Sequence, residues 1–379
     1  MPDTAAAQPV LDTKKSIILG VLGLLVIVVI FVRVIPQIGS YSDALTALQA
    51  MTAGALVCIV VSVVAYLAAY GLPFMAATPG LPYWRSQQLN QAAFAISNGV
   101  PAGGAFGLGV QYAMLASYGV GPTASTAAIT TVGVWSIFVT LGLPILGVLA
   151  LELSGQSATS YVWPGVLGLL VLVVSIVGFA LIVRSESAAR HIGSAGDRVV
   201  APLARRFAKD RTVDLVPAAL KFRSDIAGLV TRRWAAITGA QLSVSLTQFL
   251  IFYVALRGVE GWGSAGTSLL VAFGSFAVAQ IGLMIPITPG GLGTVDAAMI
   301  ALLTAFGVDA GAATAADLVW RAASFVPQIL IGVVALITWS RRGARALAER
   351  DAARGERTGS ASTDRLEPGQ PAPGPGRDT

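Results

Sequence analysis

Long uncharged stretches constrain this chain more than any other feature of its sequence. Residues 45–72 and 234–256 contain no Asp, Glu, Lys or Arg. An α-helix of about 20 such residues spans the hydrocarbon core of a bilayer. Only 12% of all residues are charged, against about 25% in an average soluble domain. Because the short alternating segments of a membrane β-barrel do not occur, the sequence predicts an all-α integral membrane protein, a polytopic helical bundle.

The apolar runs also predict how the chain is organised. We expect spans at 16–35, 45–72, 122–151, 161–183, 234–256 and 312–339, and interrupted apolar segments at 88–120 and 267–308. The predicted domains are a tail (1–15), a first membrane repeat (16–151), an outer loop (152–160), a second membrane repeat (161–339) with a basic loop (184–233), and a disordered tail (340–379).

Basic residues near the ends of the predicted spans indicate their orientation. Residues 184–233 hold eleven Lys and Arg against five Asp and Glu, and further basic residues precede the first span and follow the last. Because loops rich in Lys and Arg stay on the cytoplasmic side, we expect both termini in the cytoplasm. The net charge of +6 then reflects topology, and we predict no nucleic-acid partner. The basic loop either lies on the anionic inner leaflet or is an ordinary solvated connector.

Few residues suited to metal binding or catalysis occur in the sequence. The chain has one cysteine, Cys58, and one histidine, His191. One cysteine excludes an intramolecular disulfide, and zinc sites need three or four Cys, His or carboxylate ligands. We predict no metal, no cofactor and no catalytic residue.

The two interrupted segments resemble each other at a fixed spacing. Pro101 and Pro289 are 188 residues apart, and the same offset pairs "GV" at 119–120 with "GV" at 307–308. It also superposes 45–72 on 233–260 and 122–151 on 310–339. Each unit then holds three full spans and one discontinuous segment, so the second copy would be inverted relative to the first, as in many transporters. The alternative is a plain helical bundle with kinked spans.

Proline and glycine interrupt both segments. In "ITPGGLGTVD", Thr288 can cap a helix that begins at Pro289. The uncovered N–H groups at such a helix start would suit a phosphate. The residues concerned are Pro289, Gly290, Gly291 and Gly293 in the second break, and Pro101, Gly103 and Gly104 in the first. The alternative role of these glycines is close helix packing.

Four polar residues accompany the breaks. Asp296 follows the second break, and Asp317 and Arg321 share one face of the last span, four residues apart. Asn98 precedes the first break. Because ionisable groups are costly in lipid and usually face a pathway, we predict that these residues line a substrate path. The alternative is an ion pair that only stabilises the fold.

At these residues the chain resembles a known family. The break "PGGLG" at 289–293, Asp296, Gly307, Arg321 and Pro327 resemble the lysylphosphatidylglycerol synthase transmembrane region, also described as flippase-like. Members usually carry Glu where this chain has Asp296. Bifunctional members add a soluble aminoacyltransferase domain, and we expect none within these 379 residues, so we expect a non-enzyme.

The resemblance implies a lipid flippase-like transporter of a bacterial inner membrane. Its substrate would be an anionic phospholipid or a polyprenyl-phosphate-linked headgroup. Two alternatives remain open at this point. One is a membrane-embedded transferase that acts on a lipid-linked donor, and the other is a non-catalytic partner subunit of a membrane enzyme.

Overall fold

The structure is a computed structural model. It describes residues 46, 49–99, 103–155, 159–191, 194, 215–263, 266–284 and 289–363. The chain divides into two compact units, residues 1–335 and 336–379. The predicted span 16–35 and Pro101 lie outside the described residues.

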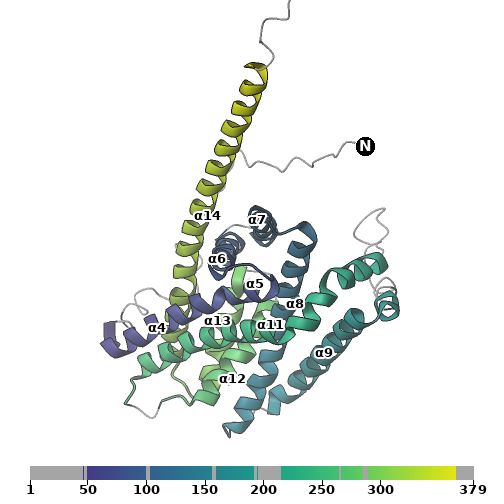
Figure 1. The fold of residues 1–379 in the computed structure, drawn as a ribbon. Helices are drawn as coiled ribbons and strands as arrows, with labels where there is room; N and C mark the ends of the chain where they lie inside the picture. The colour runs from purple at the N-terminus through teal and green to yellow at the C-terminus, as the bar shows by residue number, and fades with distance from the viewer. Residues whose placement is uncertain are drawn as a thin grey trace, which may run out of the picture. The chain divides into compact units, whose positions relative to one another are not determined.

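Helices make up the structure throughout its described part, without a strand (Figure 1). In chain order they are α4 (Ala53–Tyr70), α5 (Leu72–Ala77), α6 (Tyr83–Gly99), α7 (Gly103–Ser117), α8 (Pro122–Leu153), α9 (Thr159–Arg184), α11 (Leu215–Glu260), α12 (Leu269–Ala279), the 3₁₀ turns η2 (Gln280–Met284) and η3 (Pro289–Gly291), α13 (Thr294–Ala305) and α14 (Ala310–Thr363).

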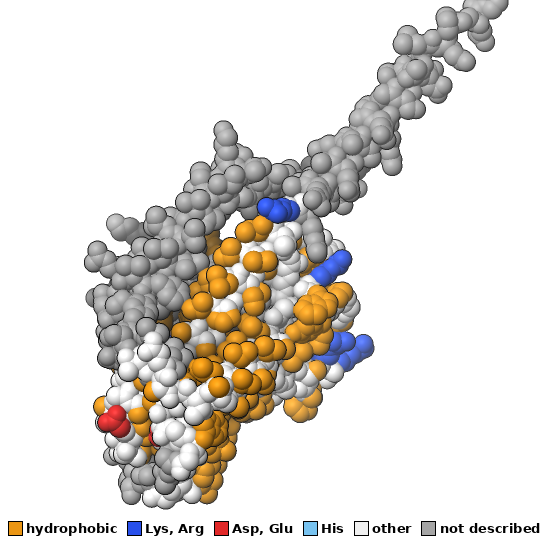
Figure 2. Space-filling view, turned by 90° about the vertical axis from the view of Figure 1, so that its left-hand side faces the viewer, with side chains coloured by type: hydrophobic (Ala, Val, Ile, Leu, Met, Phe, Trp, Pro, Cys, Tyr) orange, Lys and Arg blue, Asp and Glu red, His pale blue; other side chains and the backbone are white. Residues whose placement is uncertain are grey.

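Four of the described helical segments are long and apolar enough to cross a membrane. They are Ala53–Ala77, Pro122–Leu153, Ile226–Glu260 and Ala310–Arg341. Many of their large apolar side chains are exposed, for example Val61 at 61% and Leu330 at 62%. Figure 2 shows a broad hydrophobic surface with Lys and Arg at its margins. Such a surface would be unfavourable in water and is expected of a protein that faces lipid. The prediction of an all-α, multi-span membrane protein is confirmed.

Two predicted boundaries differ from the structure. Helix α11 begins at Leu215, so the last part of the predicted basic loop continues into the span as helix. Helix α14 runs to Thr363, whereas we predicted a disordered tail from residue 340. Residues 341–363 include six Ala and six Arg, which are good helix formers, and they continue a helix that is already nucleated.

The elements of the two predicted repeats correspond at the 188-residue spacing. Helix α8 begins at Pro122 and α14 at Ala310, while α7 ends at Ser117 and α13 at Ala305. Both turns use a left-handed glycine, Gly119 (φ 85°) and Gly307 (φ 89°). Equivalent backbone bonds close them, Val120 N–H to the Leu115 carbonyl and Val308 N–H to the Leu303 carbonyl, each at 3.0 Å. The inverted orientation of the two repeats stays a prediction.

The last helix of each repeat packs on the other repeat. Helix α8 approaches α12 so closely that a Cβ added at Gly147 would lie 3.0 Å from the carbonyl oxygen of Gly274. In the equivalent place, Gln88 Nε2 of α6 donates a hydrogen bond of 3.1 Å to the carbonyl of Ala335 in α14. Each predicted repeat thus contributes its last helix to a contact with the other.

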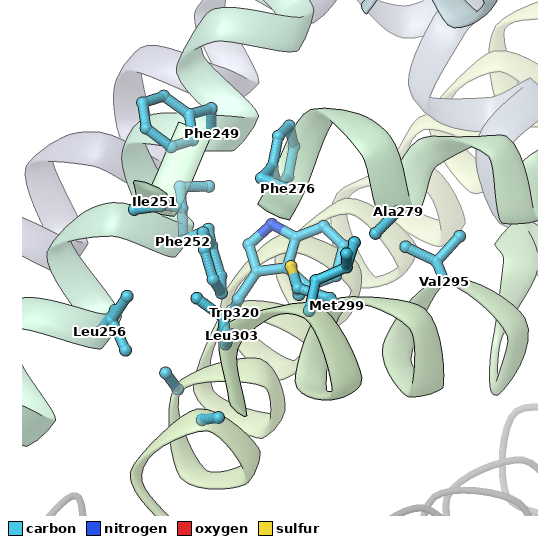
Figure 3. Packing of buried hydrophobic residues seen from close by; sticks show 14 of the residues in the cluster. Phe249, Ile251, Phe252, Leu256, Phe276, Ala279, Val295, Met299, Leu303 and Trp320 are labelled. Carbon is cyan, nitrogen blue, oxygen red and sulfur yellow. The ribbon is translucent and has the colours of Figure 1, made fainter. Parts of the chain in front are cut away.

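A core of aromatic and aliphatic side chains fixes α13 and α14 against α11 and α12. Figure 3 shows Trp320 of α14 between Phe252 and Phe276 on one side and Met299 on the other. The ring centroids of Trp320 and Phe276 are 5.6 Å apart at 82°, an edge-to-face contact that adds about 0.5–1.5 kcal/mol beyond area burial. This packing of Trp320 therefore also fixes the backbone position of Arg321, the next residue in α14.

We predict that Gly274→Val destabilises the protein by about 1–3 kcal/mol, the usual cost of overpacking. A Cβ there would lie 2.7 Å from Leu151 Cδ2 and 2.9 Å from the Gly147 carbonyl oxygen. The thermal unfolding midpoint of the purified protein in detergent measures the loss. Gly239→Val in α11 is the control, because no atom lies within 4 Å of its added Cβ. Equal midpoints for the two variants would contradict the close α8–α12 contact.

Candidate functional site

The second break folds as two tight turns before a helix. Pro289–Gly291 form the 3₁₀ turn η3, and α13 begins only at Thr294, with Gly293 as its N-cap. The prediction that the helix begins at Pro289 is wrong. Gly290 (φ 62°) and Gly293 (φ 87°) lie in the left-handed region, which glycine adopts without steric cost. The glycines redirect the chain, and α13 starts after them.

Asp296 occupies the start of α13. It is the third helical residue and is fully buried. Its Oδ2 accepts a hydrogen bond of 2.5 Å from the Gly293 N–H. A carboxylate is also favoured by the partial positive charge of a helix start. The protein's own carboxylate therefore takes one of the N–H groups at this helix start, and phosphate binding at the break stays a prediction.

Arg321 of α14 donates hydrogen bonds to the second break and to Asp296. Its Nε donates to Asp296 Oδ1. Its Nη1 donates to the carbonyl of Gly290 at 3.1 Å, and its Nη2 donates to the carbonyl of Gly291 at 3.3 Å. Carbonyls freed by a broken helix are costly inside a membrane unless something donates to them. One guanidinium thus satisfies two of them and neutralises the carboxylate.

Aromatic rings hold the guanidinium of Arg321. Its Cζ lies 4.4 Å from the ring centroid of Trp320 and 5.2 Å from that of Phe325. The side chain is 6% exposed. A cation over an aromatic face is stabilised, the more so when water is excluded.

Asp317 lies one helical turn before Arg321 and is fully buried. Neither of its carboxylate oxygens has a hydrogen-bond partner within the described part of the chain. Its electrostatic neighbours are Asp296 and Arg321. The cluster of Asp296, Asp317 and Arg321 is neutral only when one of the two carboxylates carries a proton. An uncompensated buried charge is costly, and Asp317 lies in a cluster that contains two carboxylates and only one cation.

A polar cavity of about 590 Å³ lies beside the cluster. Arg321 is the one charged side chain among the described residues that line it. The uncharged polar side chains in its wall are Tyr66, Tyr70, Asn90, Ser97, Asn98, Gln111, Ser136, Thr140, Gln241, Ser245, Gln248 and Gln280. They come from both predicted repeats, 16–151 and 161–339.

Some of the predicted site residues line this cavity, and others do not. Asn98, Gly104, Gly290 and Arg321 line it. Asp296 and Asp317 are buried behind Arg321, and Gly103 packs on α6, where an added Cβ would lie 2.7 Å from the Ser97 carbonyl oxygen. The remaining three, Pro289, Gly291 and Gly293, belong to the turns of the break.

The end of α6 lies beside the second break. Asn98, near the end of α6, has its Oδ1 3.0 Å from where a Cβ of Gly290 would lie. Sequence reasoning missed the polar residues on α8 and α11, such as Ser136, Gln241 and Gln248. The sequence did contain a signal for them, because these polar residues interrupt otherwise apolar spans.

The fold and this site define a polytopic helical membrane protein with a polar cavity beside the break that precedes α13. Comparison with known families gives a narrower assignment. Residues 18–332 match the lysylphosphatidylglycerol synthase TM region, and the chain belongs to that family. A search of curated proteins finds no match. The family and the apolar helices support a membrane location and a relation to lipid handling.

We predict different consequences for the two buried aspartates. Asp296→Asn leaves the Arg321 charge buried without its partner, which costs about 3–5 kcal/mol. Asp317→Asn removes a carboxylate that has no ion-pair partner of its own, so stability is unchanged or higher. Thermal unfolding of both variants in detergent at neutral pH tests this. A larger loss for Asp317→Asn than for Asp296→Asn would show that the pairing is wrongly assigned.

Proposed function

We propose that this protein is a flippase-like transporter that moves the headgroup of an anionic phospholipid or a polyprenyl-phosphate-linked lipid across the membrane through the polar cavity. The observation that carries the proposal is the cavity itself. It places twelve uncharged polar side chains and one guanidinium among apolar spans. A buried polar surface of this kind is costly in a membrane and usually marks a substrate path.

The side chains that line the polar cavity would let an anionic headgroup pass and would not hold it tightly. Arg321 is already neutralised by Asp296, so an anionic headgroup would meet hydrogen-bond donors and no strong positive charge. The Nη1 and Nη2 atoms each carry two N–H groups and use one on the break, which leaves one on each for a phosphate oxygen. A path requires binding that is favourable enough for the ligand to enter and weak enough for it to leave.

Asp317 offers the place where a proton would couple to this movement. With Asp317 ionised, the cluster of Asp296, Asp317 and Arg321 carries one net negative charge, which would oppose an approaching phosphate. Proton uptake at Asp317 would remove that charge and allow the phosphate to approach Arg321. An inverted arrangement of the two predicted repeats would supply the conformational change that alternating access needs, because the two copies could exchange conformations.

We predict that Gly133→Phe reduces lipid movement to the level of protein-free vesicles. Gly133 of α8 lines the polar cavity, and no atom lies within 4 Å of its added Cβ. The ring can therefore enter the cavity while the helix stays in place. The assay reconstitutes the protein in vesicles and follows chemical bleaching of fluorescent phosphatidylglycerol or a polyprenyl phosphate analogue. Bleaching beyond the outer-leaflet half reports movement.

Gly239→Phe is the matched control. It adds the same ring to a spanning helix, at a glycine with equally open surroundings that does not line the polar cavity. Gly104→Phe, in the part of the wall that α7 contributes, should block movement as Gly133→Phe does. If both cavity variants move lipid at the rate of the unmodified protein, the cavity is not the path.

A further inference from the structure

A second cavity, of about 750 Å³, lies apart from the polar cavity, and no described residue lines both. The loop between α5 and α6, the turn between α7 and α8, and one face of α11 form its wall. Three charged side chains line it, Arg85, Arg232 and Arg233, and its described wall contains no Asp or Glu. We refer to it as the arginine cavity.

The arginines of this cavity keep their positive charge available. Arg85 lies over the ring of Tyr118, with its Cζ 5.3 Å from the ring centroid. Arg233 Nη1 donates to the carbonyl of Ala76 at 3.4 Å. Neither contact neutralises a guanidinium, and in the described ranges no carboxylate forms an ion pair with any of the three. This differs from the polar cavity, where Asp296 neutralises the one arginine.

Helix starts add to the positive potential of the arginine cavity. Helix α8, of 32 residues, begins at Pro122, and its N-cap Gly121 provides no side-chain hydrogen bond. Both Gly121 and Ala124, in the first turn, line the cavity. Uncapped N–H groups at a helix start favour an anion.

A buried hydroxyl in the same wall also lacks a partner. Thr78 lines the arginine cavity and is 4% exposed, and its Oγ1 has no hydrogen-bond partner among the described residues. Buried hydroxyls are normally paired. A ligand with oxygen acceptors would satisfy this one.

Tryptophans place the arginine cavity at the membrane–water boundary. Trp84 is 77% exposed and precedes Arg85, and Trp234 is 59% exposed and follows Arg233. Exposed tryptophans beside arginines are typical of the headgroup level of a bilayer. A ligand that reaches this cavity would therefore come from the lipid headgroup layer.

We propose that the arginine cavity binds the phosphate group of an anionic lipid headgroup, with a preference for a phosphomonoester or diphosphate over a phosphodiester. Guanidinium groups recognise phosphate by paired hydrogen bonds. Three uncompensated positive charges are better matched by two or more negative charges than by one. The site is independent of the proposed transport, because it shares no lining residue with the polar cavity and binding can be measured without movement.

The test measures lipid binding to the full chain in nanodiscs of phosphatidylcholine doped with phosphatidate, phosphatidylglycerol or neither. Native mass spectrometry of the released protein counts the retained lipid. We expect phosphatidate to be retained in preference to phosphatidylglycerol, and phosphatidylcholine least. Arg232→Gln should weaken phosphatidate retention about tenfold, because a lost charged hydrogen bond is worth about one factor of ten or more. Arg232→Lys should restore part of it.

Arg190→Gln is the matched control, since it removes one exposed arginine that pairs with Glu186 outside the cavity. Three results would overturn the proposal. One is equal phosphatidate retention by Arg232→Gln and the unmodified protein, and another is an equal loss in Arg190→Gln. The third is displacement of phosphatidate by millimolar inorganic phosphate or glycerol phosphate, which would assign the site to a soluble anion. Normal retention together with failed lipid movement would leave this site standing and reject the transport proposal.

Discussion

Broken backbone at membrane depth must find hydrogen-bond partners inside the protein, because lipid offers none. Arg321 and Asp296 meet this requirement at the second break. The guanidinium donates to the carbonyls of Gly290 and Gly291, and the carboxylate accepts from the Gly293 N–H. The ion pair between them joins α13 to α14. These two charged groups together provide hydrogen-bond partners for three backbone groups of the non-helical turns.

The residues and cavities around the Asp296–Arg321 ion pair are best understood in relation to it. Trp320 packs into the aromatic core and fixes the residue that follows it, so the guanidinium is positioned by apolar packing as well as by charge. Asp317 then has no cation of its own, which leaves the proton as its natural counterion. The polar cavity opens beside a neutral pair, whereas the arginine cavity keeps three uncompensated charges. The two cavities therefore differ in chemistry, which is why we propose passage of a headgroup for one and its capture for the other.

Much of the architecture was predictable from local signals. Uncharged runs predicted four of the six expected spans, those at 45–72, 122–151, 234–256 and 312–339, and α8 (Pro122–Leu153) lies within two residues of the predicted 122–151. The 188-residue spacing predicted which elements correspond, because a repeated sequence repeats its turn chemistry at Gly119 and Gly307. The start of α13 was misplaced because proline at a first helical turn is a common signal, yet the glycines after it adopt left-handed conformations. A carboxylate three residues after Gly293 was the competing capping signal.

The polar cavity could not be predicted in the same way. Its wall combines side chains from α4 to α14, and their approach depends on how the repeats interlock. A single Gln or Ser within an apolar span does not reveal whether it faces a neighbouring helix or a cavity. The arginine cavity is similar, since Arg85 and Arg232 lie far apart in the sequence and meet only in the folded chain.

Water accessibility of the polar cavity tests the central claim most directly. Cys58 is the one native cysteine, so a Cys58→Ala background permits single-cysteine variants. Ser136→Cys lies in the wall of the polar cavity, and Val61→Cys lies on the exposed apolar face of α4. A charged, water-soluble thiol reagent applied to vesicles should modify Ser136→Cys and leave Val61→Cys unmodified. If Ser136→Cys is as unreactive as Val61→Cys, the cavity is closed to water and is not a path for a polar headgroup.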